Sequence, residues 1–103
     1  MYIVNEKDWK LYRKLVPFWQ ERYMEKLNKE YIELLSENKT ASMKFWQLEK
    51  RINIDKRHIG VSIDMRRSSM YTNICILLNE KVISFDDLKE FSEELINCIN
   101  NRY

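Results

Sequence analysis

The chain has 103 residues, of which 45% are hydrophobic and 33% charged, and its formal net charge is +2. This balance is that of a folded protein and excludes a disordered chain, while the length suits one domain over residues 1–103. A single glycine and a single proline argue against sheet architectures, because sheets need turn residues at short intervals. The composition therefore predicts an all-α fold, a small bundle of four to five helices joined by short loops.

Two helical patterns meet at Pro17. Apolar residues recur at helical spacing from Trp9 to Val16, behind a capping residue at Asn5 or Asp8, and recur again over residues 18–36. Pro17 fits the first turn of a second helix, and it fits equally well a kink in one long helix. The apolar face of the second pattern consists of Trp19, Tyr23, Met24, Leu27, Tyr31, Ile32, Leu34 and Leu35.

A third helix is predicted after the polar connector 36–40, with Thr40 as its N-cap. It should run to about Arg57 and stop at Gly60, the residue best able to adopt a left-handed cap. We expect its inward stripe to consist of Ala41, Phe45, Leu48 and Ile52.

The C-terminal third predicts two more helices. One spans about residues 62–79, and its apolar run 74–78 should lie centrally, although a buried strand is a competing interpretation of that run. The last helix should start at Ser84, with Asp87 completing a capping box and a hydrophobic staple between Ile83 and Leu88. Its apolar positions continue without interruption to Cys98.

Catalytic chemistry finds little support in the residues, and we expect no enzyme and no cofactor. His58 is the only imidazole, and with Asp55 it makes one i,i+3 ligand pair where a structural zinc site needs four ligands. Cys75 and Cys98 lie among apolar residues, which favours buried, inert thiols. No phosphate-binding loop is possible with one glycine, and no small-molecule substrate is indicated.

The predicted location is the cytoplasm, with no membrane partner. No apolar run approaches the roughly 20 residues that a membrane span requires. The first eight residues also lack the basic start and apolar centre of a signal peptide.

Charge is distributed unevenly along the chain. Residues 44–79 carry seven basic and three acidic side chains, and residues 80–103 carry three basic and six acidic ones. The basic middle either pairs with acidic groups inside the fold or binds a partner. Nucleic-acid binding through the basic cluster of residues 44–67 is the alternative function, although no recognition-helix signature accompanies that cluster.

Protein association is the function we favour from the sequence. Thirteen aromatic residues exceed what one small core needs, and large aromatic side chains are enriched at interfaces. A protein partner or a homo-oligomer is therefore expected. The candidate partner-binding residues are Trp46, Lys50, Arg51, Lys56, Arg57, Arg66 and Arg67.

Three segments resemble a family of small, uncharacterised bacterial all-helical proteins. They are KFWQLEKRI (44–52), MRRSSM (65–70) and SFDDLKEFSEEL (84–95), and the resemblance extends from about Glu6 to Leu95. Some members carry an automatic "multidrug transporter" label, which this sequence does not support because it has no membrane span. The resemblance implies no activity and no catalytic residue.

Overall fold

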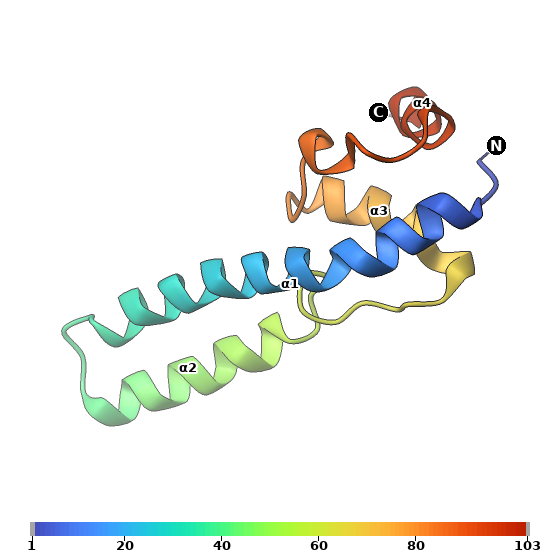
Figure 1. Cartoon of the computed structure of the whole chain (residues 1–103). Coiled ribbons are helices and arrows are strands. Elements are labelled where there is room, and N and C mark those ends of the chain that lie inside the picture. Colours follow the sequence, from blue (N-terminus) through green and yellow to red (C-terminus); the bar gives the residue numbers. More distant parts are fainter. Residues whose placement is uncertain (1, 103) are drawn as a thin grey trace.

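The computed structural model describes residues 2–102, which form helices and connecting loops with no strand (Figure 1). This confirms the all-α prediction. The α-helices are α1 (Glu6–Leu35), α2 (Ala41–Asp55), α3 (Met70–Asn79) and α4 (Glu93–Arg102), and the 3₁₀ helices are η1 (Arg67–Ser69) and η2 (Phe85–Leu88).

Helix α1 is one continuous helix of 30 residues, about 45 Å long, that passes through Pro17. The interpretation with a second helix starting at Pro17 is therefore wrong. The Asn5 side chain accepts a hydrogen bond of 2.7 Å from the Asp8 backbone N–H, so Asn5 is the N-cap.

The molecule is elongated, with extents of 53 × 22 × 21 Å. Its radius of gyration is 16.8 Å, against about 13 Å for a compact chain of this length. Figure 1 shows the reason: α3, η2 and α4 gather against the N-terminal half of α1, while α2 runs antiparallel beside the C-terminal half. We call residues 20–58, which comprise that half of α1, the connecting loop and α2, the arm.

The hydrophobic core lies at the other end from the tip of the arm. Ile74, Cys75 and Leu77 of α3 are buried, so the run 74–78 is a central helix and the strand interpretation is wrong. The fully buried side chains of the core include Tyr12, Met70, Ile74, Leu88, Leu95 and Ile99.

A buried carboxylate fastens the two ends of the chain together. Asp8 accepts hydrogen bonds from the Tyr2 hydroxyl (2.7 Å) and the Ser92 hydroxyl (2.5 Å). It also accepts one from the Ser92 backbone N–H (2.9 Å). Burial by itself would raise the pKa of the Asp8 carboxyl, but the donors from Ser92, Tyr2 and Asn5 outweigh burial and hold that pKa below its usual value.

The last predicted helix is split in two. The capping box of Ser84 and Asp87 is present, as predicted, but it opens only the four-residue η2. The helix does not continue, because Ser92 turns its N–H and hydroxyl to Asp8 and then caps α4 by accepting from the Leu95 N–H (3.2 Å).

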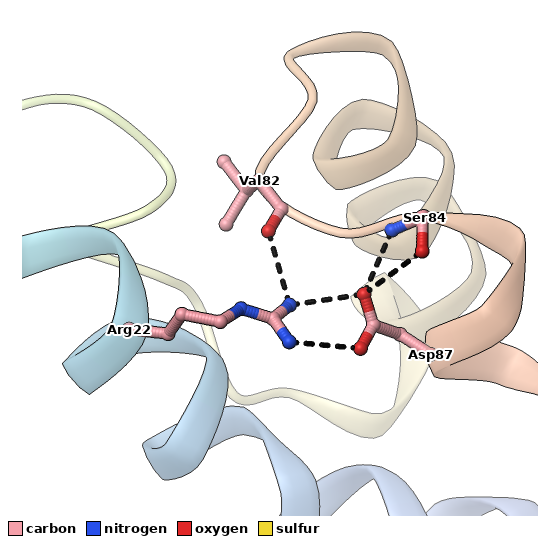
Figure 2. Close-up of polar contacts among 4 residues, drawn as sticks. All are labelled: Arg22, Val82, Ser84 and Asp87. Carbon is pink, nitrogen blue, oxygen red and sulfur yellow. Dashed lines mark hydrogen bonds and ion pairs between the residues drawn. The ribbon is translucent and has the colours of Figure 1, made fainter. Parts of the chain in front are cut away.

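Asp87 also clamps η2 to the middle of α1 (Figure 2). The Arg22 guanidinium donates to both carboxylate oxygens of Asp87 at 2.9 Å and to the Val82 carbonyl at 3.3 Å. Burial acts to raise the pKa of Asp87, and the hydrogen bonds from Arg22 and Ser84 lower it to below its ordinary value. The clamp lies where the core ends and the arm begins.

The segment between α2 and α3 corrects two further expectations. The helix expected over 62–79 starts only at Met70, because residues 60–62 form a turn and residues 63–66 an irregular connection, whose Asp64 carbonyl accepts from Asn73 (2.7 Å). Helix α2 ends at Asp55, and Gly60 has no left-handed φ; the positive φ among the described residues belongs to Lys81 (59°).

Gly60 is required for space. A Cβ atom at this position would lie 2.4 Å from Cδ2 of Tyr23, whose ring covers the glycine. The same ring stacks on His58, with centroids 4.8 Å apart. The close approach of the Gly60 backbone to the Tyr23 ring holds the segment after α2 against α1.

We expect Asp8→Asn to lower the free energy of unfolding at pH 7 by about 2–3 kcal/mol, because it removes charge-assisted hydrogen bonds. The folded carboxyl has a lowered pKa, so its contribution is complete above the unfolded value of about 3.9 and is lost as the pH falls through the folded pKa. Urea unfolding from pH 7 to pH 2.5 should therefore show a steeper acid loss in the wild type than in Asp8→Asn. The exposed control Asp86→Asn should match the wild type at pH 7, and parallel profiles for wild type and Asp8→Asn would contradict the assignment.

We expect Gly60→Ala to destabilise the protein by about 1–3 kcal/mol, because the new methyl group overlaps the Tyr23 ring. Thermal unfolding measures this cost. In a Tyr23→Ala background the same substitution should cost much less, since the obstructing ring is gone. An equal cost in both backgrounds would show that the close approach is not the cause.

Candidate functional site

The arm holds most of the predicted partner-binding residues, and its two helices meet through a polar seam. Arg51 of α2 donates to Glu30 of α1 (2.7 Å) and to Asp55 (3.1 Å), and it lies 5.5 Å over the ring of Tyr31. The Tyr31 hydroxyl donates to Asp55 at 2.7 Å. Arg51, a predicted partner-binding residue, is thus engaged within the fold.

The seam also sets the ionisation of its tyrosine. Partial burial and, to a smaller extent, the hydrogen bond to the Asp55 carboxylate raise the pKa of the Tyr31 hydroxyl to about 12. Tyr31 is therefore a neutral hydrogen-bond donor at physiological pH, and the Oδ2 atom of Asp55 accepts from both Tyr31 and Arg51.

His58 lies at the base of the arm in a packed position. Besides stacking on Tyr23, its Nδ1 accepts from the Gly60 N–H (3.0 Å) and its Nε2 lies 3.5 Å from a Glu80 oxygen. The Asp55 and His58 side chains therefore serve different neighbours and do not converge. Within residues 2–102 no three His, Cys, Asp or Glu side chains gather in a way that could hold a metal ion.

Two predicted residues lie far from the arm. Arg67 is paired with Glu6 (2.7 Å), donates to the Val4 carbonyl (3.3 Å) and lies 5.9 Å over the Trp9 ring. Its hydrogen bond lowers the pKa of Glu6. Arg66 pairs with Asp64 at 2.6 Å.

These anchors divide the candidate partner-binding residues into two groups. Arg67 is fixed near Glu6 and Arg51 near Glu30, and 24 residues of helix separate those positions by about 36 Å. The seven candidate residues do not form one surface. Trp46, Lys50, Lys56 and Arg57 remain together on α2 and the turn that follows it, and all four are exposed.

The basic middle of the chain pairs chiefly with α1 and not with the acidic tail. Arg51 and Arg67 both bind glutamates of α1, while the tail's Asp87 binds Arg22 of α1. Among the described residues, the one basic side chain of residues 44–79 that lies within 4 Å of a carboxylate of residues 80–103 is His58, whose Nε2 is 3.5 Å from a Glu80 oxygen.

Apolar side chains are exposed along the arm. Helix α2 has no buried residue. Phe45 and Trp46 are each 63% exposed, and their rings are in edge contact with centroids 4.9 Å apart. The inward stripe predicted on α2 is continuous but does not face inward, because the polar residues Arg51 and Asp55 occupy the seam instead. The exposed large apolar residues of the arm are Ile32, Leu35, Met43, Phe45, Trp46, Ile52 and Ile54.

One side of the arm carries a shallow groove of about 230 Å³, to which α1 contributes Met24 and Asn28 and α2 contributes Ile52. Helical periodicity extends this side toward the tip, since residues four and seven apart share a helix face. On α1 the residues following Asn28 are Ile32 and Leu35, and on α2 those preceding Ile52 are Leu48 and Phe45. We call Asn28, Ile32, Leu35, Phe45, Leu48 and Ile52 the groove face.

Two groove-face residues of α1, Ile32 and Leu35, belong to the apolar face that the sequence predicts for residues 18–36. Both lie beyond the reach of the core and are exposed. The available signal was the width of that face: it spans more of the helix circumference than one neighbouring helix can cover.

Across the described chain, every helix is too short or too polar to cross a membrane. Comparisons with protein-family models, with curated proteins and with solved structures found no match to this chain.

Proposed function

We propose that this protein is a non-enzymatic helical interaction module that binds a protein partner through the groove face of its arm. The carrying observation is that the arm extends away from the core and leaves Ile32, Leu35, Phe45 and Ile52 exposed. Isolated apolar residues are common on protein surfaces, whereas a contiguous apolar patch marks an interaction site.

The energetics of the arm support this function. Among its described residues, only Leu27 is a buried apolar side chain, and Leu27 lies outside the main core cluster. Covering exposed apolar surface stabilises a complex by about 25 cal/mol per Å² before the costs of association. A partner laid on the groove face would therefore supply the burial that α2 lacks.

The aromatic content of the arm supports the same reading. Phe45 projects from the groove face and contacts Trp46, which lies beside it on α2. Large, exposed aromatic side chains are the type of residue that contributes most to binding energy at interfaces. Their position near the tip makes them accessible to a partner that lies along the arm.

We expect Phe45→Ser and Ile52→Ser to abolish capture of a protein partner in pull-downs from the source cells. The untagged chain is co-expressed in these cells, so that a second copy of this chain can also be captured. Ile76→Ser, an exposed apolar residue on α3, is the matched control and should capture as the wild type does. All three variants should keep their helical circular dichroism and unfold within about 0.5 kcal/mol of the wild type, since they alter surface positions. Capture that is unchanged in the groove-face variants would contradict the proposal.

Nucleic-acid binding is a second candidate function, favoured by a different face of α2. Trp46 and Lys50 lie one turn apart on the same side of α2, and Arg57 lies in the turn that follows this helix. The structure gives Lys50 and Arg57 no ion pair among the described residues. A single strand could stack a base on Trp46 while its phosphates contact the two cations.

If this second function holds, a gel shift with a single-stranded oligonucleotide should show affinity falling roughly 7-fold between about 50 and 200 mM salt, as expected for two phosphate contacts. The double variant Lys50→Gln/Arg57→Gln should bind weakly. The matched control Lys7→Gln/Lys10→Gln removes the same charge at the far end of α1 and should bind normally. Equal weakening in both double variants would show that binding depends on net charge and not on this face of α2. An absence of binding at low salt would eliminate this candidate.

A further inference from the structure

We infer that the partner seated on the groove face is a second copy of this chain, so that two arms pack face to face into a four-helix bundle. The inference rests on the proposed function and names its partner. Each arm is already an antiparallel pair of helices with a short loop, which is half of such a bundle. A second arm would place two more helices on the uncovered groove face and so complete the bundle.

The core leaves this face free. Asn28 follows Trp19 by nine residues and Ile32 follows Tyr12 by twenty, which places each pair about 160–180° apart around α1. Trp19 and Tyr12 are buried in the core. The core therefore lies on the opposite side of α1 from the groove face, and two groove faces can meet without the cores colliding.

The area is sufficient for a specific dimer. The exposed fractions are 64% for Ile32, 43% for Leu35, 63% for Phe45 and 42% for Ile52. With roughly 200 Å² for each fully exposed large side chain, these residues offer about 400 Å² of apolar surface per copy. Interfaces are about 60% apolar, so two copies would bury about 1,300 Å² in total, within the ~1,200–2,000 Å² of stable complexes.

The charges at the rim are self-complementary. Asn28 and Ile52 line the same groove, so residues that step away from them in opposite directions along the chain lie at the same level of the arm. Glu25 is thereby level with Lys56, and Lys29 is close to the level of Glu49. All four side chains are exposed.

This pattern selects one arrangement of the two copies. When the two-fold axis runs parallel to the helices, α1 of each copy lies over α2 of the other, with both tips pointing the same way. Glu25 then faces Lys56 of the second copy, and Lys29 faces Glu49 of the second copy. Opposite charges meet twice on each side, as an isologous interface requires, and they fix the register of the apolar contact.

Sedimentation equilibrium of the full chain between about 1 and 200 µM tests the inference. The wild type should shift with concentration from a species of 12.7 kDa to one of twice that mass. Phe45→Ser and Ile52→Ser should each weaken dimerisation at least 10-fold with unchanged helical content. The control Ile54→Ser alters a more exposed residue about 200° from Ile52 on α2 and should dimerise normally.

A charge exchange tests the arrangement itself. Glu25→Lys should weaken the dimer, and adding Lys56→Glu should restore it, because the pair is rebuilt with reversed sign. Rescue supports the arrangement, and failure of the double variant to recover overturns it. A wild type that stays monomeric throughout, or a dimer insensitive to both groove-face variants, overturns the second copy as partner. Loss of capture by Phe45→Ser in the pull-down would then still uphold the proposed function with a different protein.

Discussion

The constraint that shapes this molecule is the length of α1. A helix of about 45 Å is longer than the diameter of a compact domain of 103 residues, so no single core can enclose it. Its N-terminal half is covered by α3, η2 and α4, and its C-terminal half has only α2. The elongated shape, the protruding arm and the uncovered groove face all follow from this division.

Arg22 marks the division chemically. Its bidentate bond to Asp87 ties the capping box of η2 to α1 at the last level where the core reaches the helix. From there toward the tip, the two helices share Leu27, their one buried apolar side chain in the described chain, and a polar seam in which Arg51 bridges Glu30 and Asp55. A polar seam leaves the apolar stripe of α2 beside the contact, so the sequence pattern that normally builds a core here builds a surface.

Local signals in the sequence were sufficient for the helical class and for several helix starts. Thr40 and the Ser84–Asp87 box act within three residues of their own position, so no distant contact was needed to identify them. The break at Ser92 depends on Asp8, 84 residues away, and the need for glycine at position 60 depends on the ring of Tyr23. The separation of the candidate partner-binding residues could not be predicted for the same reason: nothing local shows that the chain after α2 returns along α1 and carries Arg67 to Glu6.

The lack of any buried residue in α2 has a consequence for the order in which the protein comes apart. Regions with few buried apolar contacts open by local unfolding at a lower free energy than the core, and their amide hydrogens exchange sooner. Helix α2 can thus detach and fray while α3 and α4 remain packed on the N-terminal half of α1. The arm and the core therefore differ in their free energy of local unfolding, and a molecule that covers the arm raises the lower of the two first.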